Sequence, residues 1–234
     1  GGNGGTAVTL TGTQTLTNKT LTAPNIASAN LTTALTLAGA AGTNGQVLTS
    51  AGSGLPSWTT IGSGALTFLS SVTASNSATV DIETTFNSTY TNYLLVAADV
   101  SLVTGGGTLQ ALLKINGTYQ TGSYRTFLIS GDSSASTITG TNQDLTAFAN
   151  VFVNLGQGTR NGGFTMLIQA PSDTANIKPI SFNGSFNNNN GQITTVIGSI
   201  MCLSGNQAMT GIRFQVSSDN IDTGTFRLYG IANS

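Results

Sequence analysis

Large apolar residues in the first part of the chain recur at an interval that fits no single regular element. Leu10, Leu16, Leu21, Ile26 and Leu31 follow one another at spacings of six, five, five and five residues. A helix repeats every 3.6 residues and a strand every two. In an unbroken strand, an odd spacing would place alternate members on opposite faces. The chain must therefore turn, bulge or wrap between these residues.

The same region is too poor in apolar side chains to fold as a single chain. Thr, Gly, Asn and Ser separate the five residues, and Lys19 is the only charged residue before position 81. Burial of so few apolar groups does not offset the entropy lost when the backbone is ordered. Two alternatives remain: a flexible linker, or an elongated, intertwined β-rich shaft in which these residues meet copies of themselves on a shared axis. The regular spacing favours the shaft, because a linker needs no period.

The composition changes near residue 60. Fourteen of the fifteen charged residues lie between Asp81 and Arg227, and Trp58 is the only aromatic residue before Phe68. Gly and Ser dominate the intervening segment, as in many linkers. We predict a β-rich shaft over residues 1–61, a short linker at residues 62–65 and a globular domain over residues 66–234.

Short alternating segments recur throughout residues 66–234. Residues 212–216 place Ile, Phe and Val on one face and Arg and Gln on the other, and residues 80–86 and 109–115 alternate similarly. Other runs, such as "TFRLYGI" at residues 225–231, carry apolar groups on both faces, as expected of a sandwich whose outer face packs on a neighbour. Strong helix formers are scarce. These patterns predict an all-β domain, an antiparallel β-sandwich of jelly-roll type with nine or ten strands.

Three segments resemble known sequences. "LTGTQTLTNKTLTAPNI" (residues 10–26) resembles a segment common in tail-fibre proteins of bacteriophages, including those that infect cyanobacteria. "GTNGQVLTSAGSGLPSWTTI" (42–61) is similar to the linker that often follows it, and "NIDTGTFRLYGIANS" (220–234) is similar to the last strand of globular tips in such fibres. The three segments span about a quarter of the chain.

The resemblance implies a homotrimeric tail fibre whose terminal domain is an adhesin for the host surface. The implied partners are two further copies of this chain and a host receptor, expected to be a polysaccharide. The chain begins at Gly1 rather than Met, so we expect a missing N-terminal part that contacts other tail proteins. The implied location is the virion tail, extracellular after release. The alternative is a purely structural tail component whose C-terminal domain caps the shaft or docks another virion protein.

The sequence contains few candidate residues for catalysis or metal binding. The chain has no His, which excludes Ser-His-Asp triads and His-metal sites. Asp81 and Glu83 form the one carboxylate pair with a spacing that suits a glycosidase, but a solvated strand face explains them better. Asp219 and Asp222 suit either a calcium site or an Asx-rich turn, and the turn is favoured. We expect no enzymatic activity, no cofactor and no bound metal.

Other classes of partner are also disfavoured. The net charge is −1 and basic residues are not clustered, so we expect no nucleic-acid binding. No apolar stretch reaches the length of a membrane helix, and we expect no membrane insertion. Cys202 lies in an apolar run, which predicts a buried thiol.

Two polar loops are candidates for receptor contact. Exposed aromatic rings stack on the C–H faces of sugars, and amides bind hydroxyl groups. The alternatives are that the tyrosines pack in an interface and that the asparagines form a turn. The candidate receptor-binding residues are Tyr119, Tyr124 and Arg125 in the first loop, and Asn187, Asn188, Asn189 and Asn190 in the second.

Overall fold

A computed structural model describes residue 37 and residues 41–60, 65–83, 86–134, 138–145, 147–159, 161–204 and 206–233. The chain divides into two compact units, residues 1–61 and 62–234. The predicted linker lies outside the described residues apart from Ala65. The predicted shaft-core residues, Leu10, Leu16, Leu21, Ile26 and Leu31, also lie outside them.

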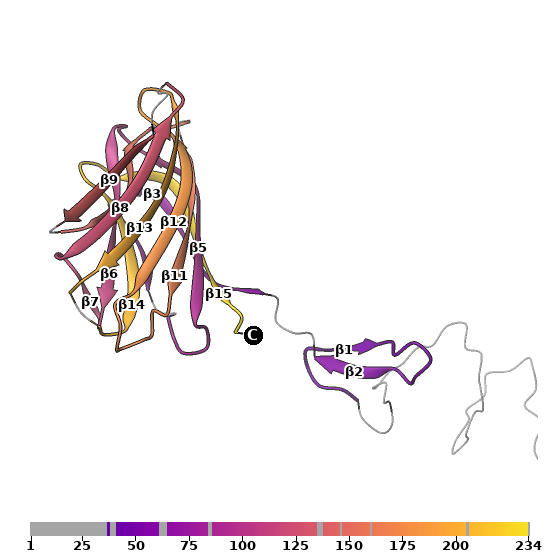
Figure 1. Cartoon of the computed structure of the whole chain (residues 1–234). Helices are drawn as coiled ribbons and strands as arrows, with labels where there is room; N and C mark the ends of the chain where they lie inside the picture. Colours follow the sequence, from indigo (N-terminus) through magenta and orange to yellow (C-terminus); the bar gives the residue numbers. More distant parts are fainter. Residues whose placement is uncertain are drawn as a thin grey trace, which may run out of the picture. The chain divides into compact units, whose positions relative to one another are not determined.

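The described part of the first unit contains a β-hairpin. Strands β1 (Gln46–Thr49) and β2 (Ser57–Thr60) pair antiparallel, with Leu48 opposite Trp58 (Figure 1). Gly42, at φ +70°, leaves room for the Trp58 ring, which lies 2.7 Å from where a Cβ would stand. Leu48 is 42% exposed and Leu55 86% exposed. A single hairpin with so little burial is marginally stable in water.

The second unit is built on one large, curved antiparallel sheet, with eight strands among the described residues (Figure 1). In order across the sheet they are β3 (Leu66–Ser77), β15 (Ile221–Ile231), β5 (Asn92–Leu102), β11 (Gly162–Gln169), β12 (Pro179–Asn187), β13 (Ile193–Cys202), β8 (Tyr124–Asp132) and β9 (Thr139–Leu145).

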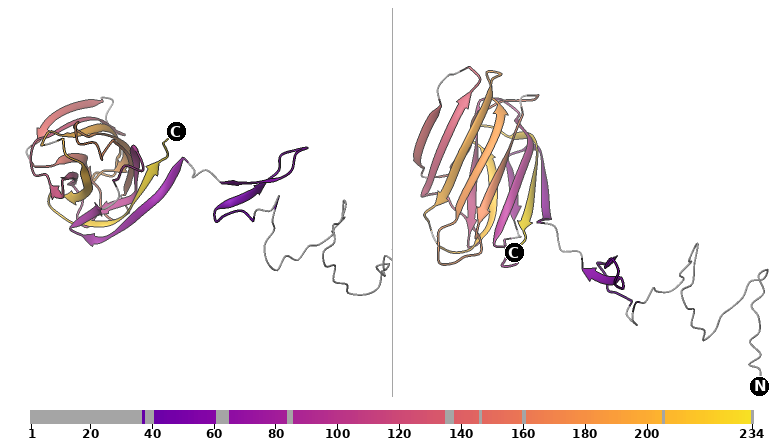
Figure 2. Two further views of the ribbon diagram at one scale, coloured as in Figure 1. Left: turned by 90° about the horizontal axis from the view of Figure 1, so that it is seen from below. Right: turned by 45° about the vertical axis from the view of Figure 1, so that its right-hand side comes forward.

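A smaller sheet packs on the inner face of the large one. Its strands, in order, are β10 (Ala149–Leu155), β6 (Gly107–Ile115), β14 (Met209–Val216) and β4 (Thr79–Glu83), with the short β7 (Thr118–Tyr119) beside β6. Seen from below, the two sheets give a rounded, barrel-like outline (Figure 2). Buried apolar side chains fill the space between the sheets. The described residues contain no helix. The all-β, antiparallel expectation is confirmed.

The strand order is that of a jelly roll. The first strand of the unit, β3, pairs with the last, β15, and β4 pairs with the next to last, β14. Consecutive strands of the chain thus cross repeatedly between the two sheets. The unit has thirteen strands among the described residues rather than nine or ten, and β12, β13, β8 and β9 extend the large sheet beyond β11.

The core follows from the alternation in the sequence. Val80 and Ile82 of β4 are buried, as are Ile212, Phe214 and Val216 of β14. These inward side chains confirm the faces predicted for both segments. The intervening Arg213 and Gln215 are half-buried on the outer face.

Five phenylalanines from both sheets meet in the centre of the sandwich. Phe214 and Phe226 stack with ring centroids 5.0 Å apart, and Phe152 and Phe186 stack at 4.5 Å. Phe164 makes edge or tilted contacts with Phe152, Phe214 and Phe226. These ring contacts join the two sheets across the core.

Candidate functional site

The first candidate loop begins with a tight β-turn. Asn116 and Gly117 both have positive φ, 48° and 77°, between β6 and β7. This is the pair of residues that a two-residue type I′ hairpin prefers. The turn sets a register in which Tyr119 lies opposite Lys114. Thr210 of β14 ties the turn down by accepting a hydrogen bond from the Gly117 N–H at 3.1 Å.

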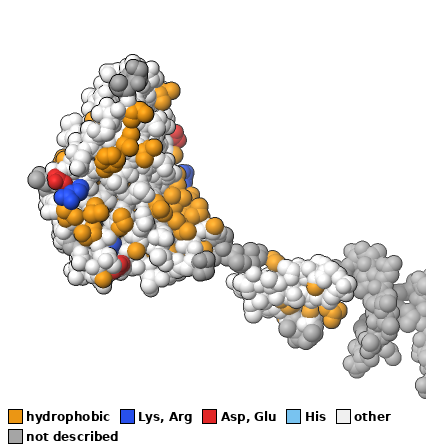
Figure 3. Space-filling view, viewed as in Figure 1, with side chains coloured by type: hydrophobic (Ala, Val, Ile, Leu, Met, Phe, Trp, Pro, Cys, Tyr) orange, Lys and Arg blue, Asp and Glu red, His pale blue; other side chains and the backbone are white. Residues whose placement is uncertain are grey.

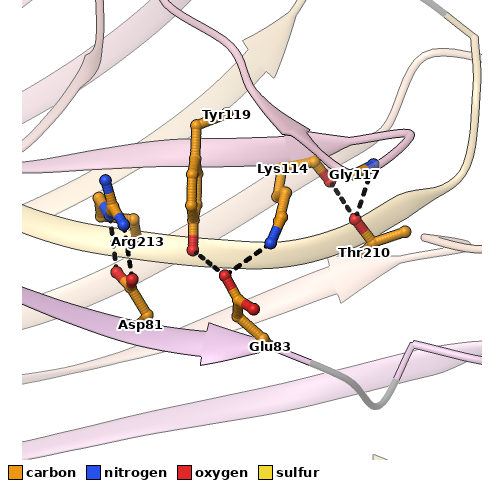
Figure 4. Close-up of polar contacts among 7 residues, drawn as sticks. All are labelled: Asp81, Glu83, Lys114, Gly117, Tyr119, Thr210 and Arg213. Atoms are coloured by element: carbon orange, nitrogen blue, oxygen red, sulfur yellow. Dashed lines mark hydrogen bonds and ion pairs between the residues drawn. The ribbon is translucent and has the colours of Figure 1, made fainter.

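Tyr119 lies in a cluster of charged residues on the outer face of the small sheet (Figure 4). The Arg213 guanidinium lies 4.0 Å from the Tyr119 ring centroid and binds both carboxylate oxygens of Asp81, at 2.7 and 2.6 Å. Glu83 accepts hydrogen bonds from Tyr119 Oη at 2.8 Å and from Lys114 Nζ at 2.7 Å. We call these five residues the Tyr119 cluster. It joins β4, β14, β6 and β7.

The electrostatics of the cluster stabilise the ionised form of Glu83. Hydrogen bonds from Lys114 and then Tyr119 hold the pKa of the Glu83 carboxyl below its usual value. Burial, followed by the hydrogen bond to Glu83, raises the pKa of Tyr119. The hydrogen bond to Asp81 raises the pKa of Arg213.

This arrangement does not supply the chemistry of a glycosidase pair. One carboxyl of such a pair acts as a general acid and needs a raised pKa. Glu83 has a lowered pKa, and Asp81 is held bidentately by Arg213. The two carboxylates therefore act as ion-pair partners across the sheet. Tyr119 is half-buried among them rather than displayed on a mobile loop.

Tyr124 points into the core, so the hypothesis that it contacts a receptor is wrong. It is 1% exposed, its hydroxyl accepts a hydrogen bond from the Leu113 N–H at 2.7 Å, and it donates one to the Gln120 carbonyl at 3.1 Å. Burial raises the pKa of its hydroxyl. The physical reason is the two-residue period of β8, which turns Tyr124 inward and its neighbour Arg125 outward.

Arg125 is exposed on the outer face of the large sheet. Its side chain is 55% exposed and its Nε donates to Asp144 Oδ1 at 2.8 Å across the β8–β9 pair. The hydrogen bond to Asp144 raises the pKa of Arg125. Tyr119, Tyr124 and Arg125 therefore occupy three different environments and form no single binding surface.

The asparagine loop is a tight turn between β12 and β13, organised by Asn188. This side chain is 5% exposed, and its Oδ1 accepts hydrogen bonds from the backbone N–H groups of Asn190 and Gln192, both at 3.0 Å. Asn188 is therefore a structural residue, and the receptor-contact hypothesis is wrong for it. Asn187 and Asn189 are half-buried, whereas Asn190 is exposed.

The remaining polar candidates have structural roles. Asp219 accepts a hydrogen bond from the Thr104 N–H through Oδ2, which ties the turn after β5 to the start of β15. No group of three or more His, Cys, Asp or Glu residues gathers in the described part of the chain. Cys202 is 3% exposed, so the prediction of a buried thiol is confirmed.

The outer face of the large sheet carries an apolar band. Phe68, Tyr229, Leu94 and Leu167 are cross-strand neighbours on β3, β15, β5 and β11, and the rings of Phe68 and Tyr229 meet at 5.8 Å. Phe68 is 56% exposed. Leu66 and Ile231 continue the band toward the start of β3.

A second apolar area lies on the same face over β8 and β13 (Figure 3). Ile129 lies opposite Ile197, and Phe127 and Met201 follow this pair toward the start of β8 and the end of β13. The four side chains are between 36% and 57% exposed. We call these four residues the β8–β13 patch. Apolar runs on both strand faces are the sequence signal for both areas, but sequence reasoning did not single out their residues.

Comparisons with known proteins identify no relative: no family model, no curated protein and no solved structure matches this chain. Among the described residues, no helix is long and apolar enough to cross a membrane.

Proposed function

We propose that this chain is the distal part of a bacteriophage tail fibre and that its C-terminal sandwich attaches the particle to the host surface. The observation that carries the proposal is the apolar band on the large sheet. Exposed apolar areas of this kind mark contacts with other molecules. The band begins at Leu66, at most about 20 Å of chain from Thr60 at the end of β2.

Copies of this chain are the partner that the band fits best. The β1–β2 hairpin and the predicted shaft also need apolar partners, because neither buries enough surface alone. Copies joined along residues 1–61 would bring their Leu66 residues within reach of one another. The resemblance to tail fibres implies three copies. Three tips on each fibre then convert weak single-site binding into firm attachment.

In this proposal the tip binds and does not cleave. The Tyr119 cluster pairs each of its carboxylates with a cation, and such pairs support the sheet. The sandwich has a core of stacked phenylalanines, and it carries exposed turn residues such as Asn190 at the ends of its strands. Rigid display of contact groups lowers the entropy lost on binding.

Sedimentation of the full chain tests the assembly. The wild type is expected to sediment at three times the 23.7 kDa mass of one chain. Phe68→Asp should raise the concentration at which the assembly dissociates by about tenfold or more, because a carboxylate would be buried against apolar surface. Ile138→Asp, at a residue that is 77% exposed and outside the band, is the matched control. A monomeric wild type, or equal effects of both variants, would contradict the proposal.

The β8–β13 patch favours a second candidate, a structural component that docks another virion protein. Adsorption separates the two functions. A labelled full-length chain should bind intact cells of susceptible bacteria, cyanobacteria included, if it is an adhesin. Absence of cell binding, combined with capture of a purified tail protein that Ile197→Asp abolishes, would support the docking function instead.

A further inference from the structure

The outer face of the large sheet is hollowed next to the apolar band. Two adjoining hollows of about 430 and 620 Å³ share Ala97, Gly163 and Ser185, and together they form an open groove over β5, β11, β12 and β13. The groove exists because outward positions in its floor hold small residues. Gly163 has no side chain and Ser185 has a short one, where longer side chains would fill the space. The volume suits a small ligand or a few sugar rings.

A β-bulge directs Asp99 into this groove. Between β5 and β15, Ser101 lies opposite Thr223 and Ala98 opposite Thr225, so β5 contains one extra residue. Asp99 has a φ of 56°, a left-handed conformation that is costly for most residues other than glycine. Bulges of this kind re-aim side chains and are common beside functional sites.

Hydrogen bonds hold the bulge in place. Thr223 Oγ1 donates to the Asp99 carbonyl at 2.8 Å, and it lies 2.9 Å from the hydroxyl of Ser101, which is 0% exposed. Asn161 Nδ2 donates to Asp99 Oδ1 at 3.1 Å, and the Asn161 carbonyl accepts from the Asn187 N–H at 3.0 Å. The groove end is therefore a polar site in which Thr223 of β15 holds the Asp99 backbone and Asn161, just before β11, holds the Asp99 carboxylate.

The opposite wall of the groove is apolar. Ile193 and Ile197 of β13 line it and are 61% and 57% exposed. Asp99 is the one charged residue among the described residues that line the two hollows. A sugar ring presents hydroxyl groups at its edge and C–H groups on its face, and so it matches a polar end beside an apolar wall. An anionic ligand is disfavoured, because Asp99 would repel it.

We propose that this groove binds an uncharged or amine-bearing saccharide. Asp99 and Asn161 hold hydroxyl or ammonium groups of one ring, while Ile193 and Ile197 pack against C–H groups. The inference rests on the proposed adhesive function, since it supplies the ligand class and the contact residues. It also accounts for Asn187, the candidate residue that lies on the groove wall.

Two variants test the groove by different means. Asp99→Asn removes the charge and keeps the bulge, because Asn tolerates positive φ well and the Asp99 carbonyl bond to Thr223 is a backbone interaction. Ser185→Trp fills the groove from an exposed position on β12. The matched control is Asp144→Asn, which removes one carboxylate from β9 of the same sheet, outside the groove.

The measurement uses the full-length chain on an oligosaccharide array with neutral, amino-sugar and uronic-acid members. The wild type should bind neutral or amino-sugar members. Asp99→Asn should weaken that binding by about tenfold, the effect of losing a hydrogen bond to a charged group. Ser185→Trp should abolish it, and Asp144→Asn should leave it unchanged. Near-UV circular dichroism establishes whether each variant is folded, and if Ser185→Trp is not, Asp99→Asn decides.

Three results would overturn the inference: no array binding by the wild type, binding confined to uronic-acid members, or unchanged binding by folded variants. The same experiments distinguish failure of the groove inference from failure of the adhesin proposal. If the wild type adsorbs to cells and Ser185→Trp adsorbs equally, the groove inference fails while the adhesin proposal stands. If the wild type binds the array through the groove but adsorbs to no cell, the adhesin proposal fails and the groove inference stands.

Discussion

The outer faces of the two sheets differ in the contacts that their side chains make. On the small sheet, Asp81, Glu83, Lys114 and Arg213 pair with one another around the Tyr119 ring, all within one domain. On the large sheet, Leu66 and Phe68 of the apolar band and Ile193 and Ile197 of the groove are exposed to solvent. The ion pairs Glu83–Lys114, Asp81–Arg213 and Arg125–Asp144 each join two strands, so part of the small charge of this chain serves to hold the sheets together. In the proposed function, the face that contacts other molecules is the apolar and amide-rich one.

The largest expected effect on stability comes from comparing a phenylalanine in the core with one on the outer face of the large sheet. Phe214→Ala should lower the free energy of unfolding by about 3–5 kcal/mol, because it leaves a cavity among stacked rings. Phe68→Ala removes the same atoms from the exposed band and should cost less than about 1 kcal/mol in dilute solution. Urea unfolding of the full chain at low concentration measures both. Equal losses would mean that the band is part of the core rather than an open face.

A smaller effect on stability is expected from Tyr124 and Tyr119, which the sequence analysis assigned to the same candidate loop. Tyr124→Phe leaves the buried Leu113 N–H without its acceptor and should cost about 1–3 kcal/mol. Tyr119→Phe removes one hydrogen bond to Glu83, which keeps Lys114, and should cost about 0.5–1 kcal/mol. The comparison uses thermal unfolding of both variants. A larger loss for Tyr119→Phe would show that the Tyr119 cluster, not the core, dominates stability.

The smallest effect is the pH dependence that the Tyr119 cluster contributes. The pKa of Glu83 is lower in the folded chain than its usual value of 4.5, so its stabilising effect is complete above that value and is lost as the pH falls through the folded pKa. The loss should stay below about 1 kcal/mol, because the Glu83 side chain is 40% exposed.

The measurement is the free energy of unfolding between pH 6 and about pH 3 for the wild type and Glu83→Gln. The wild type should lose more stability than Glu83→Gln over that interval. Parallel curves for the two proteins would show that the carboxylate of Glu83 does not contribute, and that the small sheet is held by packing alone.

Much of the fold class was predictable because it depends on local alternation. Ile212, Phe214 and Val216 face inward on β14, as their spacing predicts, and Val80 and Ile82 do so on β4. The number of strands was not predictable to the same degree. Strand β12 does alternate, with Ile180, Phe182 and Phe186 buried, whereas β7 has only two residues and β9 is polar apart from its last residue, so these two carry no apolar period.

The candidate residues were predicted less well. Arg125 and Asn190 are exposed, as receptor contact requires, whereas Tyr124 and Asn188 are buried. Loop composition indicates polarity but not the direction of each side chain. Asp99 was not singled out, because its role depends on a bulge whose register is set by β11 and β15.

The sequence by itself determined that the described part of the chain is all-β, that residues 80–83 and 212–216 each place apolar side chains on one strand face, and that a chain without His has no His-based chemistry. These properties follow from composition and from a two-residue period. Only the tertiary structure decided that Asp81 meets Arg213, 132 positions away, and that Asp99 lies in the same groove as Ile193. Such contacts arise from the pairing of distant strands, which no local pattern in the sequence specifies.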